Sequence, residues 1–215
     1  MMKKIQVIDN IISKKEQEYL KNIFYSNEFP WFYTADVTSS ILNKKQSRPA
    51  FSHIFMKDGN INSNYYDIVK KISDNVNKKI KKKLIPYQVR SFLQLSLDKN
   101  LIGNSIDTPH IDMIEPHLVY LYYVNDCDGD TVIYDYISNG THTLDIPFYE
   151  DIKIKKKITP KQGMVVIFDG MTWHTSTQPT RGNRCIINFD MINNKTWQIT
   201  ISMIYYNTIK EIEYE

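Results

Sequence analysis

The sequence predicts an α+β fold, in which a helical first third is followed by a core of short strands. Hydrophobic residues recur at helical spacing before residue 83, so residues 62–83 are expected to form a long amphipathic helix. From about residue 86 the hydrophobic period changes to two, which is typical of strands. Many short strands joined by polar turns favour a sandwich or an open-ended barrel. The positions that define the helical period are Ile61, Tyr65, Ile68, Val69, Ile72, Val76 and Ile80.

Two elements are expected before this helix. Residues 5–8 form a short apolar run typical of a strand. Ser13 and Glu16 have the spacing of a capping box, in which a serine caps a helix and a glutamate three positions later completes the cap. The helix that follows is expected to bury Tyr19, Leu20, Ile23 and Phe24. The expected strands of the core are residues 89–97, 118–124, 131–134, 164–168, 185–190 and 197–205.

Composition is that of a globular protein. The chain has 215 residues, of which 42% are hydrophobic and 24% charged, and it shows no internal repeat or linker, so one domain spanning 1–215 is expected. The net charge of +3 does not indicate a nucleic-acid-binding protein. No segment has the roughly 20 consecutive apolar residues of a membrane span. Cys127 and Cys185 form no disulfide or zinc pattern, which favours a reduced, cytoplasmic protein with two free thiols.

The residues that indicate chemistry begin at His110 and Asp112. Residues two apart on an extended segment point to the same side, so an imidazole and a carboxylate at this spacing can reach one metal ion. An H-x-D pair alone is weak evidence, because it also arises by chance at the exposed end of a loop.

His174 and Arg184 strengthen the case. His174 follows the apolar run 164–168 and a turn. Arg184 lies ten positions further and begins another apolar run, where a guanidinium is costly to bury unless it meets an anion. Two histidines and one carboxylate on one side of a metal form the facial triad of non-haem Fe(II) oxygenases.

The order of these motifs resembles the 2-oxoglutarate oxygenase superfamily, and most closely its prolyl 4-hydroxylase-like branch. The resemblance covers residues 87–191, and the N-terminal third carries much less of it. Two positions depart from the family pattern, since Asp128 replaces a glycine and Asp130 a glutamate in the segment that resembles its GGET-x-F turn. The matching segments are Thr108-Pro109-His110-Ile111-Asp112, Leu121-Tyr122-Tyr123-Val124-Asn125-Asp126, Asp128-Gly129-Asp130-Thr131-Val132-Ile133-Tyr134, Pro160-Lys161-Gln162-Gly163-Met164-Val165-Val166-Ile167-Phe168 and Arg184-Cys185-Ile186-Ile187-Asn188-Phe189.

The resemblance implies a double-stranded β-helix, or jelly roll, over about residues 86–206, with the helices of about 1–85 packed on one sheet. It implies Fe(II) held by His110, Asp112 and His174. The co-substrate 2-oxoglutarate would chelate the iron and extend its far carboxylate to Arg184, with O2 at the remaining site and ascorbate as a reductant that such enzymes can use. Tyr123 would help Arg184 hold this carboxylate, although a purely structural place in the core is an equal alternative.

The expected activity is hydroxylation of an unactivated C–H bond in a protein side chain, a free amino acid or a small metabolite. Two alternatives remain. One is a nucleobase-modifying oxygenase, which the modest charge and the missing second alkylation-repair signature disfavour. The other is a non-catalytic jelly-roll module that only binds a ligand. Neither the substrate nor the oligomeric state follows from the sequence.

Three further segments have a functional and a structural interpretation. Residues 37–50 are polar and aperiodic, and are a candidate lid over the barrel mouth. Residues 31–33, Trp-Phe-Tyr, could line a substrate groove or pack in the core. The basic run 78–83 could contact phosphates, but a solvated helix end is the favoured interpretation.

Overall fold

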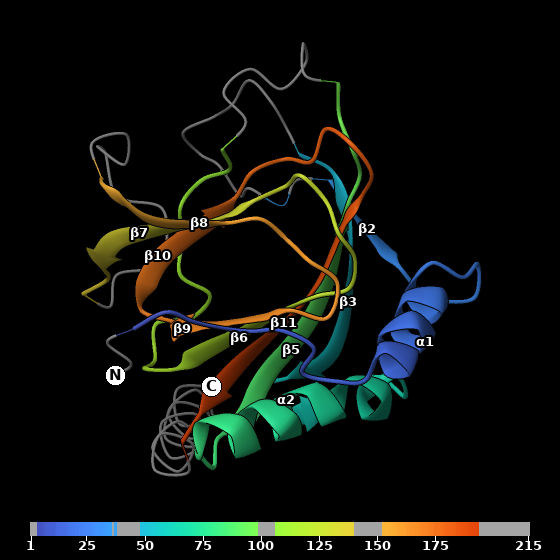
Figure 1. Ribbon diagram of the computed structural model, residues 1–215, viewed down its shortest axis with the longest axis horizontal. Helices are drawn as coiled ribbons and strands as arrows, with labels where there is room; N and C mark the ends of the chain where they lie inside the picture. The colour runs from blue at the N-terminus through green and yellow to red at the C-terminus, as the bar shows by residue number, and fades with distance from the viewer. Residues whose placement is uncertain (1–3, 36, 38–47, 99–105, 140–151, 194–215) are drawn as a thin grey trace, which may run out of the picture.

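The computed structural model describes residues 4–35, 37, 48–98, 106–139 and 152–193. Two helices and a mainly antiparallel set of strands make up this part of the chain (Figure 1). In chain order the elements are β1 (Gln6–Ile8), α1 (Lys14–Phe24), β2 (Phe32–Thr34), β3 (Ala50–Lys57), β4 (Asn60–Ile61), α2 (Tyr66–Ile80), β5 (Ile85–Gln94), β6 (Leu118–Tyr123), β7 (Thr131–Ile137), β8 (Ile154–Ile158), β9 (Val165–Asp169), β10 (Thr172–Ser176) and β11 (Arg184–Ile192).

The strands form two sheets that face each other. The larger sheet has the order β1-β9-β6-β11-β5-β3-β2, with β4 added beside β3, and the smaller has the order β10-β7-β8. Figure 1 shows the smaller sheet above the larger one, with α2 running beneath the larger sheet. All strand pairings are antiparallel, and strands distant in sequence lie side by side, as β11 does between β5 and β6. This arrangement agrees with the jelly-roll core that the motifs imply.

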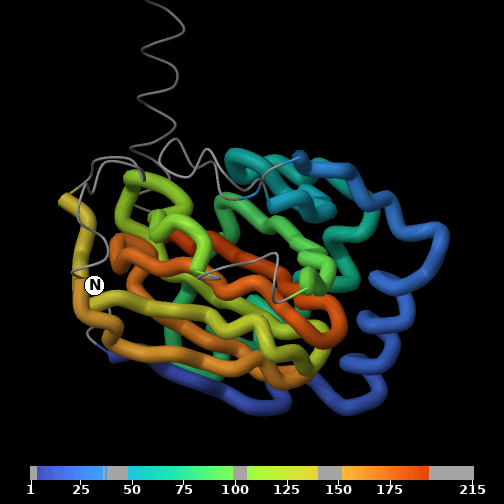
Figure 2. Tube along the Cα trace, turned by 90° about the horizontal axis from the view of Figure 1, so that it is seen from above, coloured from blue at the N-terminus to red at the C-terminus, as the bar shows by residue number. Residues whose placement is uncertain are grey.

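Alternation along β6 explains why this strand is entirely buried. Tyr120 and Tyr122 belong to the hydrophobic cluster that also contains Leu20 and Phe24 of α1 and Val76 of α2. The side chains that alternate with them, Val119, Leu121 and Tyr123, belong to a second cluster on the opposite face of the strand. A strand covered on both faces has no polar side, which accounts for its continuous apolar sequence. Figure 2 shows α1 beside the sheets, at the end of the molecule opposite β8.

The helices agree with the sequence in part. Ser13 caps α1 and Glu16 completes the capping box, as predicted. Leu20 and Phe24 are buried as predicted, but the prediction was wrong for Tyr19, which is 58% exposed. The prediction was also wrong for Ile61, which is 64% exposed. Ile61 belongs to β4, a two-residue strand that pairs with β3 and ends before α2 begins.

The strand predictions agree with β1, β5, β6, β7, β9 and β11 to within a few residues. The expected strand 197–205 lies outside the described residues. The first third of the chain is not only helical, because β2, β3 and β4 extend the larger sheet beyond β5. The strand β8 was missed because lysines occupy three of its four exposed positions, a composition suited to a strand at the edge of a sheet.

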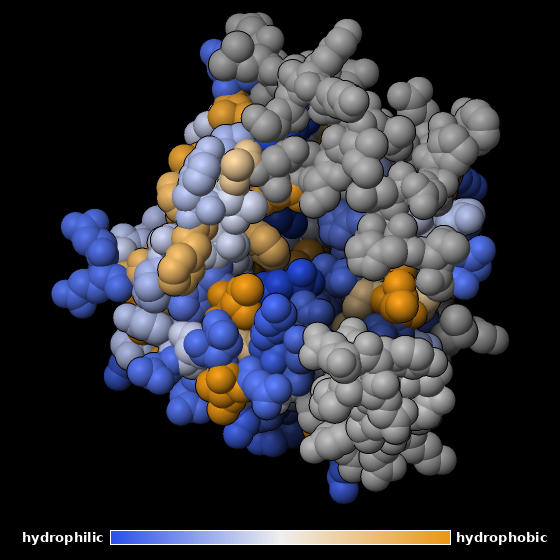
Figure 3. All heavy atoms as spheres, turned by 180° about the vertical axis from the view of Figure 1, so that it is seen from behind, coloured by the Kyte–Doolittle hydropathy of each residue, from blue (hydrophilic) through white to orange (hydrophobic). Residues whose placement is uncertain are grey.

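The described surface is mostly hydrophilic. Figure 3 shows hydrophobic residues scattered among hydrophilic ones on the described part of one face. The lysines of the run 78–83 are exposed at the end of α2, in agreement with a solvated helix end. Trp31 packs against the core and donates a hydrogen bond to the Phe24 carbonyl (2.9 Å), whereas Phe32 and Tyr33 are exposed. Within the described ranges, no helix has the length and apolar character needed to cross a membrane.

Candidate metal and 2-oxoglutarate site

A cavity of about 480 Å³ lies between the two sheets. Its wall includes His110, Asp112, His174 and Arg184, so four of the five residues singled out in the sequence face one space. Tyr123 is not part of the wall and is fully buried behind it.

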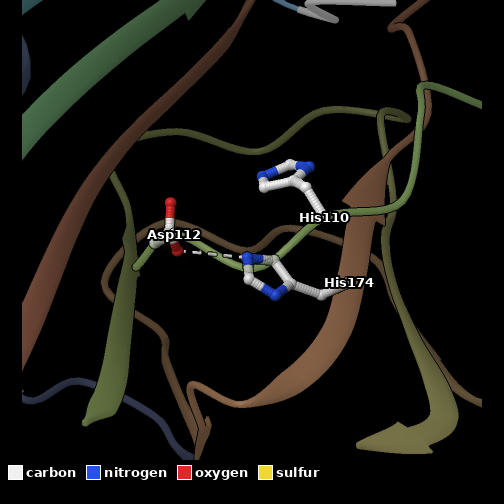
Figure 4. A group of neighbouring side chains, drawn as sticks. All are labelled: His110, Asp112 and His174. Atoms are coloured by element: carbon white, nitrogen blue, oxygen red, sulfur yellow. Dashed lines mark ion pairs between the residues drawn. The ribbon is translucent and has the colours of Figure 1, made fainter. Parts of the chain in front are cut away.

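The two histidines are placed by the backbone. His174 belongs to β10, and its neighbour across the sheet is His110, which is held by a reciprocal pair of N–H to carbonyl hydrogen bonds of 2.9 Å each. This pairing brings the ring centroids to 4.8 Å (Figure 4). Asp112 follows two positions after His110 and turns its carboxylate toward the His174 ring.

Both imidazoles are held in the tautomer that leaves Nε2 able to bind a metal. His110 Nδ1 lies 3.1 Å from the Thr108 carbonyl, and His174 Nδ1 lies 3.0 Å from the Thr172 carbonyl. A carbonyl oxygen can only accept, so in each neutral ring Nδ1 carries the hydrogen and Nε2 carries the lone pair. Backbone partners of this kind are the usual means of orienting a histidine ligand.

The third group completes a cluster of ligand atoms. The candidate ligand atoms of His110, Asp112 and His174 all lie within 4.8 Å of one another. His174 Nε2 lies 3.2 Å from Asp112 Oδ2, so a lone pair faces a buried carboxylate oxygen when His174 is neutral. That contact is unfavourable unless a proton or a cation lies there. Imidazole and carboxylate donors suit a first-row divalent metal, so these residues fit the iron that the motifs imply.

The charges of the cluster also suit a metal. Burial lowers the pKa of His110 to about 4, and the neighbouring His174 adds to this effect. Burial would raise the pKa of Asp112, but the Arg90 guanidinium and His174 hold it well below its usual range. Burial also lowers the pKa of His174, but the hydrogen bond and charge of Asp112 outweigh this and raise it. At neutral pH the cluster therefore offers one neutral imidazole and one carboxylate without losing a proton.

Arg184 begins β11 and is 4% exposed. Its Nε donates to the Gly129 carbonyl (3.0 Å), its Nη1 to Gln94 Oε1 (3.0 Å) and its Nη2 to Thr131 Oγ1 (2.9 Å). These bonds use three of the five N–H groups of a guanidinium and leave one on each terminal nitrogen. The group is thus held by three bonds and retains one unused donor on each terminal nitrogen for a ligand.

Tyr123 acts on this region through Thr131. The Tyr123 hydroxyl donates to Thr131 Oγ1 (2.7 Å), and the Arg184 guanidinium lies 6.0 Å from the centre of the Tyr123 ring. Because Thr131 Oγ1 accepts from both neighbours, its own hydrogen can be donated to a ligand in the cavity. As predicted, Tyr120 and Tyr122 face away, toward the helices.

Several wall residues were missed in the sequence. Arg90 of β5 donates to Asp112 (2.7 Å) and to Asp190 of β11 (2.9 Å), which is fully buried. Burial and the charge of Asp112 raise the pKa of Asp190 to about 6, against the effect of Arg90. Asp107, at the other end of the cavity, pairs with the buried Arg48 (3.2 Å). The polar residues of β5 and β11 alternate with apolar ones, and a strand with one solvent-facing side has the same pattern.

The candidate lid is described only at its ends. Residues 38–47 lie outside the described residues. Val37 and Thr34 line the cavity, and the Val37 N–H donates to the Arg48 carbonyl (2.9 Å), so both ends of the 37–50 segment lie close together at the wall.

No protein-family model matches the sequence, and no curated protein matches it. Solved structures do match. An oxidoreductase of the 2OG-Fe(II) oxygenase family from Burkholderia pseudomallei has a TM-score of 0.61 at 8% identity, covering 87% of this chain and 84% of that chain. A prolyl hydroxylase from Trichoplax adhaerens, solved with a hypoxia inducible factor peptide, has a TM-score of 0.56 at 13% identity, covering 91% and 86%.

A third structure is HygX from Streptomyces hygroscopicus, solved with nickel, 2-oxoglutarate and hygromycin B. It has a TM-score of 0.56 at 10% identity, covering 88% of this chain and 83% of that chain. At such low identities the likeness establishes the fold. The chain has the fold of the 2-oxoglutarate/Fe(II) oxygenases.

Proposed function

We propose that this chain is an Fe(II)- and 2-oxoglutarate-dependent dioxygenase that hydroxylates an unactivated C–H bond. One observation carries the proposal: two imidazole rings and a carboxylate converge in the same cavity as a buried arginine that retains two unused donors. A metal-binding module needs only the three ligands. A dicarboxylate that chelates the metal through one end also needs a partner for its far carboxylate. A buried cation at a distance from the three ligands provides that partner.

His110, Asp112 and His174 would hold the iron and leave coordination sites for 2-oxoglutarate and O2. The bound iron supplies the coupled oxidation, in which 2-oxoglutarate yields succinate and CO2 and the substrate gains a hydroxyl group. Arg184 and Thr131 would bind the far carboxylate of 2-oxoglutarate. The cavity walls would limit the access of water to the reaction, and ascorbate would serve only to keep the iron reduced.

The function is tested by titrating the anaerobic Fe(II) protein with 2-oxoglutarate and recording visible spectra. A charge-transfer band that saturates with 2-oxoglutarate supports the proposal. The proposal is wrong if the protein binds Fe(II) but gives no band and shows no affinity for 2-oxoglutarate by calorimetry. The chain would then be better described as a non-catalytic binding module.

The relative roles of Tyr123 and Thr131 yield a separate prediction. Thr131→Val removes an acceptor of Arg184 and the donor to the ligand, so we expect 2-oxoglutarate to bind roughly 10- to 100-fold more weakly, as for a lost hydrogen bond to a charged group. Tyr123→Phe removes a bond only to Thr131, and we expect a change of about threefold or less. Calorimetric affinities at saturating metal measure both. A larger loss in Tyr123→Phe would place this hydroxyl in direct contact with the ligand.

A substitution at Gly129 tests whether the packing behind Arg184 positions its guanidinium. A Cβ at this position would lie 2.9 Å from Arg184 Cδ and 3.0 Å from the Thr177 carbonyl oxygen. Gly129→Ala should therefore displace the guanidinium without changing its charge and weaken 2-oxoglutarate binding by about tenfold, while the metal affinity stays the same. Equal weakening of metal and 2-oxoglutarate binding would instead indicate a general loss of structure.

A further inference from the structure

A second polar pair lies in the cavity wall, at the end that holds Asp112. Arg90 of β5 and Asn188 of β11 are direct partners across the sheet, so their side chains project from the same face. Both line the cavity. Neither belongs to the metal ligands or to the residues around Arg184.

The Arg90 guanidinium already has its counter-charges. Its Nη2 donates both to Asp112 Oδ1 (2.7 Å) and to Asp190 Oδ2 (2.9 Å). Two carboxylates around one cation leave no net attraction for an anionic ligand. The Arg90 Nε is nevertheless buried and has no hydrogen-bond partner among the described residues.

Asn188 offers the complementary group. Its Nδ2 lies 3.2 Å from Asp190 Oδ1, and because a carboxylate accepts, this contact fixes the orientation of the amide. Asn188 is 4% exposed, and its Oδ1 is buried without a partner in the described part of the chain. The wall therefore holds an unused donor and an unused acceptor on neighbouring strands, which is unfavourable unless a ligand meets them.

This pair is separate from the place of 2-oxoglutarate. Arg184 and Asn188 lie four positions apart on β11, which is about 13 Å along an extended strand. The co-substrate would extend from the metal ligands toward Arg184, whereas Arg90 contacts Asp112, one of those ligands. An apolar wall residue adjoins the pair, since the Phe92 ring centre lies 5.9 Å from Arg90 Cζ.

We propose that Arg90 and Asn188 recognise a neutral amide group of the primary substrate, with its carbonyl accepting from Arg90 Nε and its N–H donating to Asn188 Oδ1. The inference rests on the proposed function and specifies its substrate class. A primary carboxamide, or one residue of an extended peptide, presents a carbonyl and an N–H toward the same side. A carboxylate lacks the donor and would be repelled by Asp112 and Asp190.

The test uses protein loaded with Zn(II) and 2-oxoglutarate, in which no turnover occurs. The probes are the N-acetyl amides of the twenty amino acids, and binding is detected by ligand-observed NMR and quantified by calorimetry. We expect at least one amide to bind, and the matching N-acetyl amino alcohol, which has a hydroxymethyl group in place of the carboxamide, to bind more weakly.

The variants locate the contact. Asn188→Leu replaces the amide with a side chain of similar volume and should weaken binding of the amide probe by about tenfold. Arg90→Lys keeps the positive charge but removes the Nε–H group, and it should weaken binding of the probe to a similar extent. Asn60→Leu, an exposed change on β4, is the matched control and should have no effect. Zn(II) and 2-oxoglutarate affinities of Asn188→Leu should equal those of the wild type.

Three results would overturn the inference: equal probe binding in Asn188→Leu and wild type, no amide binding to a wild type that holds 2-oxoglutarate, or tighter binding of the alcohols than of the amides. Failure of the proposed function looks different, because 2-oxoglutarate itself would then not bind to the wild type. In that case the same amide titration with Zn(II) alone decides whether the pair binds amides.

Discussion

Replacing Arg184 with alanine should weaken the binding of 2-oxoglutarate by about 2–4 kcal/mol, or roughly 30- to 700-fold, and leave the metal affinity unchanged. The expected loss is large because Arg184 is buried and held by three hydrogen bonds, so its unused donors are already oriented before the ligand arrives. A preorganised, charge-assisted contact away from water contributes more than an exposed one. Calorimetric titration of 2-oxoglutarate at saturating metal measures the change.

Arg184→Lys and Arg181→Ala are the controls. An ammonium group restores the charge without the two-point geometry, so Arg184→Lys should recover only part of the affinity. Arg181 precedes β11 by three positions, but its side chain is 87% exposed and lies 3.6 Å from Asp128. Arg181→Ala should therefore bind 2-oxoglutarate as the wild type does. The carboxylate anchor lies elsewhere if Arg184→Ala keeps full affinity while its unfolding midpoint shows an intact fold.

The convergence of His110, Asp112 and His174 could be predicted in part from local spacing and in part from the order of the motifs. His110 and Asp112 are two positions apart on an extended segment, and His174 ends up opposite His110 across one backbone bridge. The motif order was also sufficient to predict the jelly-roll arrangement. The alternation rule correctly separated Tyr123 from Tyr120 and Tyr122, because successive residues of β6 face different clusters.

The polar wall could not be predicted in the same way. Alternation distinguishes the two faces of a strand, but it does not say whether a polar face meets solvent or a cavity. Asp190 illustrates the difficulty: it is fully buried, and its ion-pair partner Arg90 lies one hundred positions earlier, on the neighbouring strand. A pairing of such distant residues depends on the strand order and leaves no local signal in the sequence.

The metal site predicts a stability that depends on the metal. A ligand that binds only the folded state stabilises it, by about 2.7 kcal/mol at a hundredfold excess over its dissociation constant. For a chain of this length that corresponds to a rise of roughly 5–10 °C in the unfolding midpoint. We expect this rise when Fe(II) is added anaerobically to chelator-treated wild type.

Asp112→Ala should abolish the rise without unfolding the protein. Arg90 keeps its bond to Asp190, so no buried cation is left unpaired, and His174 loses the carboxylate oxygen that faces its Nε2 at 3.2 Å. The variant without metal should therefore unfold near the midpoint of the metal-free wild type. Asp135→Ala, which removes only an exposed contact with Lys155, should retain the full response to Fe(II). Because an acid is removed in both variants, a difference between them reports ligation and not charge. If Asp112→Ala is still stabilised by Fe(II) as strongly as the wild type, the metal binds through other groups and the assignment of this carboxylate is wrong.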